Sequence, residues 1–262
     1  MQNGKRGVGS SIIVLLLLLA FMMPADASQY YINELLEANP PPQVLKEGPV
    51  VRVKQPGVQK QTPDEGSTEV EEEKPLRKVA LTFDDGPEAH YTSRILDILQ
   101  VEGVSATFFV VGEFVARYPK LVQRMYDDGH LIANHSHTHG DLSLLTNEEI
   151  IALELAPTSR AVEKLTGFYP MIMRPPYGSL RDDSVRYLKE NGWKIVRWSL
   201  DTFDWDSRRN KPEQIITRIQ TQHHPGAIVL MHCNGPATTR VLPDIIKTLR
   251  ELGYQFVTVT QL

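Results

Sequence analysis

Short runs of apolar residues alternate with longer amphipathic segments from residue 79 to the end of the chain. The apolar runs have the length of buried strands, and turn-forming residues bound several of them. We therefore predict seven strands, at 79–83, 106–111, 131–133, 171–173, 194–200, 227–231 and 256–259.

The segments between the apolar runs have helical periodicity. Helices are expected at 92–99, 119–128, 146–167, 182–191, 212–222 and 242–252. The helix at 146–167 is expected to kink at Pro157, because proline lacks the N–H that an interior helical residue donates. Gly112 is expected to end the second strand.

Regular alternation of strands and helices predicts an α/β fold with parallel strands and right-handed crossovers. An open doubly wound sheet and a barrel both satisfy this pattern. No glycine-rich phosphate loop follows the first strand, which disfavours a nucleotide-binding open sheet, so we predict a barrel-like domain. In both architectures functional groups gather beyond the carboxyl ends of the strands.

Residues 1–27 have the pattern of a secretory signal peptide. Lys5 and Arg6 precede an apolar run at 12–23, and cleavage is expected after Ala27. The run is shorter than the roughly 20 residues of a membrane-spanning helix, and an uncleaved membrane anchor is the alternative. We therefore expect an exported protein that is secreted or associated with the cell envelope.

Residues 28–76 are predicted to be a mostly disordered spacer. Prolines recur between residues 40 and 63, and acidic residues crowd the stretch 64–73, so little apolar surface is available for a core. The spacer would hold one globular domain, residues 77–262, away from a membrane or a wall.

Composition and charge indicate which classes of binding partner are not expected for this chain. The 262-residue chain is 41% hydrophobic and 23% charged, with a net charge of −4. No block of Lys and Arg stands out after the N-terminal segment, so nucleic acid is not an expected partner. No protein partner is indicated, and a monomer is expected. Cys233 is the single cysteine, which excludes a disulfide within the chain and favours a packed thiol over a metal ligand.

Polar side chains cluster directly after five of the predicted strands. The clusters are Asp84 and Asp85; His135, His137 and His139; Arg174; Asp201, Asp204 and Trp205; and His232. Because the carboxyl ends of parallel strands meet at one edge of a sheet, we expect these side chains to lie together.

The histidine tract offers metal ligands. Two histidines four residues apart share a helical face, and a carboxylate from another strand, Asp85, would complete a site with open positions for water and substrate. Any two of His135, His137 and His139 can form the pair, and the spacing favours His135 with His139. A solvated histidine-rich loop is the alternative.

Hydrolysis at a metal also needs a base and an acid. Asp84 is the candidate base, because neighbouring side chains on a strand point to opposite sides and can do different work. Arg174 would hold that carboxylate, or would form a purely structural ion pair. His232 is the candidate acid, and Asp204 beside it would favour its protonated form.

Two further side chains have open interpretations. Tyr177 lies in a proline-rich turn whose backbone N–H can face an oxyanion. Trp205 is either a core residue or a wall of a substrate site.

Together the motifs resemble the five ordered motifs of the polysaccharide deacetylases, the NodB-homology enzymes of carbohydrate esterase family 4. The matching segments are Thr82-Phe-Asp-Asp-Gly86, His135-Ser-x-x-His139, Arg174-Pro-Pro-Tyr-Gly178, Asp201-x-x-Asp-Trp205 and Leu230-x-His232. The resemblance spans nearly the whole domain. It implies a distorted (β/α)7 barrel that removes acetyl groups from N-acetylated sugars with a divalent metal, often zinc.

The resemblance also implies a role for each residue. The metal ligands would be Asp85, His135 and His139, with His137 left free. The proton-transfer group would be Asp84 as base, Arg174 as the residue that orients it, His232 as acid and Asp204 as the residue that tunes the acid. The substrate group would be Tyr177, through its backbone N–H, with Trp205 and Leu230 as walls of the acetyl pocket.

We therefore expect an exported metal-dependent deacetylase acting on an N-acetylated glycan, either peptidoglycan or a chitin-like polymer. Export and the spacer favour cell-wall peptidoglycan. Zinc is the expected ion, with cobalt or manganese as alternatives. A non-catalytic wall-binding module on the same scaffold and an esterase acting on acetylated xylan are the alternative functions.

Overall fold

The computed structural model describes residues 77–262. The predicted signal peptide (1–27) and spacer (28–76) lie outside the described residues. Within 77–262, no helix combines the length and the apolar character that crossing a membrane requires.

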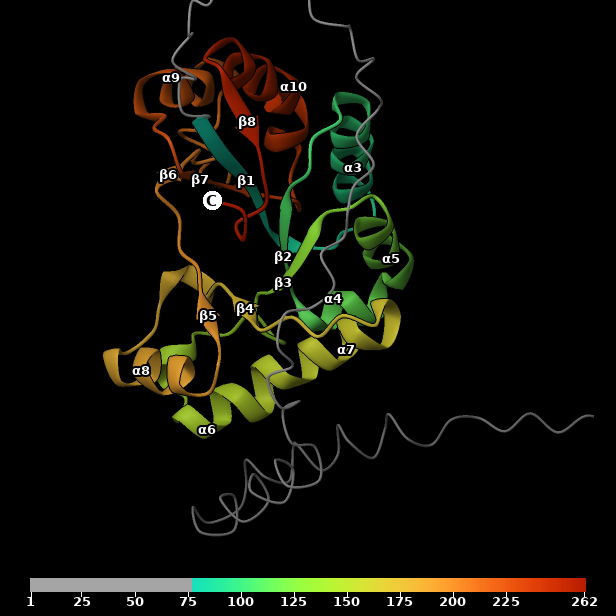
Figure 1. Cartoon of the computed structure of the whole chain (residues 1–262), viewed down its shortest axis with the longest axis vertical. Coiled ribbons are helices and arrows are strands. Elements are labelled where there is room, and N and C mark those ends of the chain that lie inside the picture. Colours follow the sequence, from blue (N-terminus) through green and yellow to red (C-terminus); the bar gives the residue numbers. More distant parts are fainter. Residues whose placement is uncertain (1–76) are drawn as a thin grey trace, which may run out of the picture.

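Eight parallel strands form one curled sheet, with helices around its outside (Figure 1). The strands are β1 (Arg77–Gly86), β2 (Thr107–Val110), β3 (Leu131–Asn134), β4 (Ile172–Met173), β5 (Lys194–Ile195), β6 (Leu200–Asp201), β7 (Ala227–His232) and β8 (Tyr254–Phe256). Their order is β5-β4-β3-β2-β1-β7-β6, and β8 pairs with the first residues of β1. The sheet is the curled half-barrel that the predicted distorted (β/α)7 fold requires, so that prediction is confirmed.

The crossovers between strands are helical. The helices are α3 (Tyr91–Glu102), α4 (Gly112–Arg117), α5 (Pro119–Asp127), α6 (Asn147–Glu149), α7 (Ala156–Thr166), α8 (Asp182–Glu190), α9 (Pro212–Gln222) and α10 (Pro236–Glu251). Three shorter or irregular turns complete them: η1 (Leu142–Leu144), the π-helix η2 (Ile150–Leu155) and η3 (Pro176–Gly178).

The prediction of one fifth strand at 194–200 is wrong. The segment divides into β5, which pairs with β4, and β6, which pairs with β7 at the opposite end of the sheet order. Between them, Val196 N–H donates to the Met173 carbonyl and Ser199 N–H donates to the Ile228 carbonyl. The chain thus crosses the opening of the half-barrel, and the segment 194–200 contributes one short strand to each edge of the sheet.

Three other boundaries differ from the prediction. Gly112 does not simply end a strand but begins α4, and its N–H donates to the Ser136 carbonyl. Helix α10 begins at Pro236, before the predicted start at residue 242, although Pro243 lies inside it. Burial of one face of α10 compensates for the hydrogen bond that Pro243 cannot make. The last strand ends at Phe256, not at residue 259.

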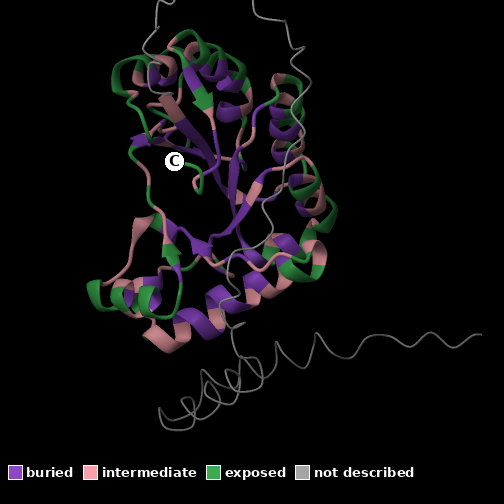
Figure 2. Ribbon diagram, viewed as in Figure 1, coloured by how far each residue is buried: buried purple, intermediate pink, exposed green. Residues whose placement is uncertain are grey.

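The main core lies between the sheet and α3, α5, α9 and α10. The rings of Phe83 on β1 and Phe108 on β2 stack with centroids 5.1 Å apart. Figure 2 shows the buried strands inside and the exposed helix faces outside. A second core cluster packs α8 against the long helical segment α6–η2–α7. These two cores fix the carboxyl ends of β1, β3, β4 and β7 relative to one another.

Candidate active site

Register in the sheet brings the predicted residues together. On β1 and β7, Asp84 is the register partner of His232. The ends of β3 and β4 also pair, so the residues that follow, His135 and Arg174, are neighbours. One edge of the sheet therefore holds the candidate base Asp84, the candidate acid His232 and the first histidine, His135. This placement is the one predicted from the positions of the strand ends.

The two adjacent aspartates do not point to opposite sides of the sheet, which corrects that expectation. Asp85 has a φ of 66°, and the register of β1 against β2 shifts between Phe83 and Gly86. This left-handed residue turns its carboxylate toward the same space as Asp84. Asp84 Oδ2 lies 3.7 Å and Asp85 Oδ1 lies 3.4 Å from His135 Nε2.

Asp85, His135 and His139 form a cluster that suits a divalent cation. Their candidate ligand atoms all lie within 4.8 Å of one another, and Asp85 Oδ1 is 3.0 Å from His139 Nε2. The Nδ1–H of His135 donates to the Arg174 carbonyl at 2.8 Å, so Nε2, which faces Asp85, is the ring atom left to bind a cation. Two imidazoles and one carboxylate fit zinc and several other divalent ions.

The histidines lie on a loop, so the expectation that they share a helical face is wrong. The loop follows β3, and two of its residues, Ser136 and His139, have positive φ values of 68° and 61°. His139 N–H donates to Ser136 Oγ across this turn. Within residues 77–262, His137 is not part of the metal-ligand cluster, and its buried Nδ1 has no hydrogen-bond partner.

The Asp85 carboxylate and the His139 imidazole of the cluster shift each other's pKa values. The pKa of the Asp85 carboxyl is held far below its usual range, because hydrogen bonds from His135 and His139 outweigh the effect of burial. The hydrogen bond with Asp85 in turn raises the pKa of His139. An ionised carboxylate beside imidazoles is the state in which such a site takes up a cation.

Arg174 lies fully buried beneath the site. Its Nη1 donates to Asp84 Oδ1 at 2.7 Å and to Thr82 Oγ1 at 2.9 Å. The guanidinium also lies over the Phe109 ring, 4.1 Å from its centroid, and donates to the Arg197 carbonyl. One oxygen of Asp84 is therefore fixed by a charged hydrogen bond, while the other faces the histidine cluster.

His232 and Asp204 form the second pair. His232 Nδ1 lies 2.8 Å from Asp204 Oδ1, and the backbone N–H of His232 donates to Asp204 Oδ2 at 2.7 Å. Thr238 Oγ1 also donates to Oδ2. Burial by itself lowers the pKa of His232, but the hydrogen bond and charge of Asp204, with Asp84 and Asp85 nearby, raise it to about 9. The imidazole is therefore protonated at neutral pH.

The predicted substrate residues differ in exposure. Tyr177 is 72% exposed, has a φ of 59°, and its ring meets that of His139 edge-on with centroids 5.0 Å apart. Trp205 is 57% exposed, so the interpretation of Trp205 as a core residue is wrong. Leu230 is buried in β7, and its carbonyl accepts hydrogen bonds from Thr202. The substrate roles of these residues stay predictions.

Sequence reasoning missed two contacts behind the site. Asn234 Nδ2 donates to Asp85 Oδ2 at 3.1 Å, and no spacing rule marks that residue. Cys233 is fully buried, and its Sγ–H donates to the Asp84 carbonyl at 3.1 Å. A Cβ on Gly86 would lie 2.1 Å from the Cys233 sulfur, so thiol and glycine pack as a unit. Burial raises the pKa of Cys233, which agrees with a packed, unreactive thiol.

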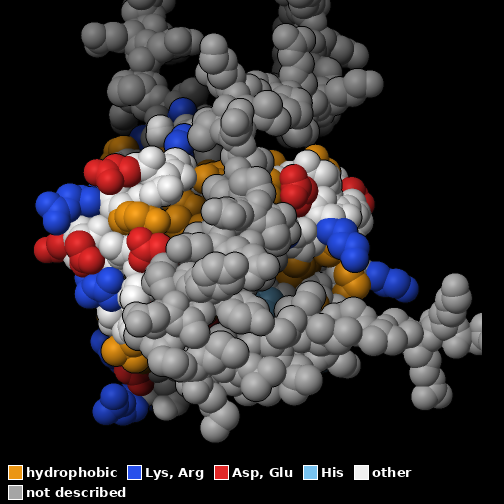
Figure 3. Space-filling model, turned by 90° about the horizontal axis from the view of Figure 1, so that it is seen from below, with side chains coloured by type: hydrophobic (Ala, Val, Ile, Leu, Met, Phe, Trp, Pro, Cys, Tyr) orange, Lys and Arg blue, Asp and Glu red, His pale blue; other side chains and the backbone are white. Residues whose placement is uncertain are grey.

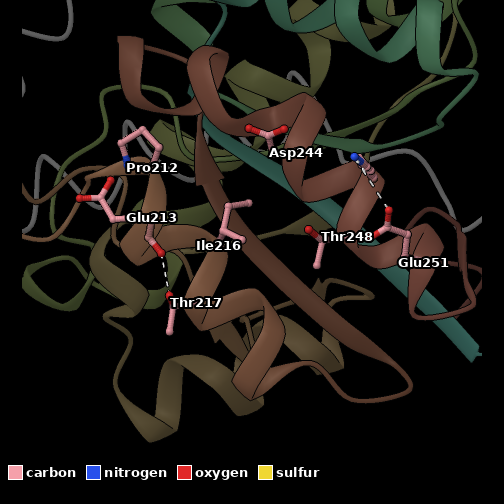
Figure 4. A pocket seen from close by; sticks show the side chains of 8 residues that line it. Pro212, Glu213, Ile216, Thr217, Asp244, Thr248 and Glu251 are labelled. Atoms are coloured by element: carbon pink, nitrogen blue, oxygen red, sulfur yellow. Dashed lines mark hydrogen bonds and ion pairs between the residues drawn. The ribbon is translucent and has the colours of Figure 1, made fainter.

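Other surface features lie apart from these residues. A shallow groove between α9 and α10 has no residue in common with the candidate site (Figure 4). Its lining combines the carboxylates of Glu213, Asp244 and Glu251 with Lys247 and Ile216. Where side chains are coloured in Figure 3, acidic and basic groups are interspersed.

Comparison with known proteins gives consistent matches. The polysaccharide deacetylase family model matches residues 71–196. A peptidoglycan-N-acetylglucosamine deacetylase of Bacillus cereus is 34% identical over 186 residues, covering 70% of this chain and 66% of that protein. The peptidoglycan-N-acetylmuramic acid deacetylase PdaA of Bacillus subtilis is 37% identical over 188 residues, covering 71% of each. This chain thus spans just under two thirds of the Bacillus cereus relative.

A solved structure extends the likeness to the fold. BA3943 of Bacillus anthracis, described as a pseudoenzyme of the CE4 family, matches with a TM-score of 0.66 and 34% identity, covering 72% of this chain and 66% of that chain. Sequence and fold agree with the motifs at the strand ends, and the chain belongs to the polysaccharide deacetylase family, carbohydrate esterase family 4.

Proposed function

We propose that this chain is an exported metal-dependent deacetylase that hydrolyses the acetamide of N-acetylated sugars in cell-wall peptidoglycan. One observation carries the proposal: two charge-matched pairs, Asp84 with Arg174 and His232 with Asp204, flank the Asp85–His135–His139 cluster. Relatives described as peptidoglycan deacetylases support the choice of glycan.

Asp85, His135 and His139 would hold the metal, with zinc as the expected ion. When bound there, a divalent cation supplies Lewis acidity toward the acetyl carbonyl and toward water. The hydrogen bond from His135 to the Arg174 carbonyl fixes the imidazole orientation that this ligand role needs.

Asp84 would act as the base. Arg174 occupies Oδ1, so Oδ2 remains to accept a proton from the attacking water. The water oxygen forms a bond to the acetyl carbon, and the carbonyl oxygen gains negative charge. The backbone N–H of Tyr177 is the expected donor to that oxyanion.

His232 would complete the reaction as the acid. Its Nδ1–H is held by Asp204, so Nε2–H is the proton available to the sugar nitrogen. Protonation of that nitrogen lets the carbon–nitrogen bond break, which yields acetate and a free amine. The proton taken up by Asp84 and the proton lost by His232 balance the hydrolysis.

The alternative function is a non-catalytic wall-binding module. It is supported by the Bacillus anthracis relative, a member of this family that is described as a pseudoenzyme. A non-catalytic wall-binding module would retain the fold and the glycan surface. Such a module would need neither a base such as Asp84 that is held by a buried arginine, nor an acid such as His232 whose pKa is raised by a neighbouring carboxylate. The retained proton-transfer pairs therefore favour the enzyme.

Acetate release from a panel of substrates tests the proposal. The full chain, loaded with zinc, cobalt or manganese after chelation, is incubated with peptidoglycan, N-acetylglucosamine oligomers and acetylated xylan. We expect acetate and new amino groups from peptidoglycan. Acetate from xylan alone would indicate the esterase, and binding to peptidoglycan without acetate release would indicate the non-catalytic module.

The signal peptide (1–27) and the spacer (28–76) belong to the same proposal, since peptidoglycan lies outside the cytoplasm. Release of a mature protein beginning at Ser28, detected by mass spectrometry of the exported fraction, is the expected result. Retention of the apolar run in the membrane fraction would indicate an uncleaved anchor.

A further inference from the structure

A π-helix interrupts the long helical segment opposite the histidine loop. The segment begins with a capping box, in which Thr146 and Glu149 exchange side-chain and backbone hydrogen bonds, and it continues through η2 into α7. Pro157 lies in the first turn of α7, directly after the wide turn. Isolated π-turns in α-helices are frequent at functional sites.

Glu154, in that wide turn, contacts the histidine loop through both carboxyl oxygens. Oε2 accepts from the backbone N–H of His137 at 2.7 Å and from that of Thr138 at 2.9 Å. Oε1 accepts from Thr138 Oγ1 at 2.7 Å. Glu154 is only 6% exposed, so these three bonds are formed away from bulk water.

The same helical segment makes other bonds to the base of the loop. The Leu155 carbonyl accepts from Asn134 Nδ2 at 2.7 Å. Asn134 Oδ1 in turn accepts from Ser136 N–H, and Thr158 Oγ1 donates to the Ser136 carbonyl. Glu154 is the member of this set that reaches the tip of the loop.

The loop needs such support because its backbone is unfavourable by itself. Ser136 and His139 both have positive φ, a conformation that costs a non-glycine residue free energy and persists only where its surroundings impose it. His139 is also a candidate ligand, so the angle of its imidazole depends on the strained backbone. Glu154 binds the two residues between Ser136 and His139.

We propose that Glu154 is a positioning residue of the metal site: it holds the 136–139 loop so that His139 faces Asp85. The proposal rests on the metal dependence of the proposed function, but it concerns binding of the ion and not turnover. The role is geometric. An uncharged side chain of the same shape that still accepts from the two loop N–H groups should replace Glu154.

Zinc affinity measures this role directly. The metal-free full chain and its variants are titrated with Zn²⁺ against a chelator of known affinity, and circular dichroism follows the thermal unfolding of each metal-free form. Glu154→Leu should weaken zinc binding roughly 10- to 100-fold, the usual cost of losing a residue that supports metal ligands. Glu154→Gln should stay within about threefold of wild type, because its amide oxygen accepts both N–H groups and its amide NH2 can donate to Thr138 Oγ1.

Glu163→Leu is the matched control, since Glu163 lies on an exposed position of the same helical segment. Thr138→Val removes one of the three hydrogen bonds and should give an intermediate loss of zinc affinity. This second variant tests the proposal even if Glu154→Leu does not fold. Unchanged zinc affinity in Glu154→Leu, or in Thr138→Val where the first variant is unfolded, would overturn the proposal. So would an equal loss in Glu163→Leu.

Failure of the proposed function gives a different result. A wild-type chain that binds zinc but releases no acetate would refute the deacetylase and leave the role of Glu154 intact. If the wild-type chain releases acetate but Glu154→Leu does not change zinc affinity, the role of Glu154 is refuted and the deacetylase is left intact.

Discussion

The two sides of the site are held by different kinds of structure. On one side, the proposed base Asp84 and the proposed acid His232 lie on β1 and β7, whose six consecutive register pairs run from Val79–Ala227 to Asp84–His232. On the other side, the proposed ligands His135 and His139 lie on the loop after β3, where the side chains of Glu154 and Thr158 bond the loop backbone. Regular strand pairing fixes the first side, whereas individual side chains fix the second.

This difference implies different sensitivity to substitution. On the first side, Asp84 or His232 can be exchanged without moving its neighbours, because the ladder of backbone hydrogen bonds remains. A residue that supports the histidine loop acts on the position of the ligands. The following predictions test that contrast, beginning with the largest effect.

Asp84→Asn should reduce kcat by roughly 10²- to 10⁴-fold while metal content stays at the wild-type level. The amide cannot accept the proton of water, but the strand around it is unchanged. Acetate release and metal analysis on the same sample check both statements. Near-wild-type turnover with metal bound would contradict the role of Asp84 as base.

Arg174→Met should lower the free energy of unfolding by about 3–5 kcal/mol, because it leaves the buried Asp84 carboxylate without its partner. Denaturant unfolding at neutral pH measures the loss. Lys247→Met, which breaks an exposed pair with Glu251, is the control and should cost less than about 1 kcal/mol. Equal losses of unfolding free energy in the two variants would show that the buried pair stabilises the fold no more than the exposed pair does.

Activity should fall as pH rises through the pKa of His232, because the deprotonated imidazole cannot act as the acid. That pKa is about 9 with Asp85 charged, and a bound cation offsets the Asp85 charge, so the falling limb lies at or below pH 9. Asp204→Asn removes the charge that raises the pKa and should move the limb to lower pH. A pH–rate profile of kcat/KM checks the shift, and an unmoved limb would contradict the pairing.

The same shift predicts a dependence of stability on pH. The folded-state pKa of His232 is raised above its ordinary value of 6.5. Its contribution to stability is therefore fully present below about pH 6.5 and is lost as pH rises through about 9. Asp204→Asn should flatten this part of the curve of unfolding free energy against pH.

Trp205→Ala should give the smallest effect, a rise in KM of roughly 2- to 10-fold with kcat nearly unchanged, as expected for an exposed ring that only contacts substrate. Steady-state kinetics on a soluble glycan measures it. A fall in kcat without a change in KM would instead place the ring close to the reacting atoms.

The contrast between the two sides also explains what the sequence could predict. Strand ends are readable from apolar runs, so the meeting of Asp84, His232, His135 and Arg174 at one edge follows from the order of elements. The turn of Asp85 toward Asp84 is not readable, because it depends on a left-handed backbone that only the packed sheet imposes.

Long-range contacts set the other limit. The segment 194–200, predicted as one strand, gives no sign that its two ends pair with opposite edges of the sheet. Glu154 is one of several acidic residues in a helical pattern, and the pattern does not mark it as the one that lies in a π-turn and bonds the loop. In both cases the deciding partner lies far away in the sequence, so local pattern carries no information about it.

The central claim is that the Asp85–His135–His139 cluster and its flanking pairs form one hydrolytic site. Its most direct test is acetate release from peptidoglycan by the full chain, measured while zinc is added back to the chelated protein. We expect activity to be lost on chelation and to return in proportion to added zinc, reaching its maximum at one ion per chain. Full activity in the chelated protein, or none when one ion is bound, would contradict that claim.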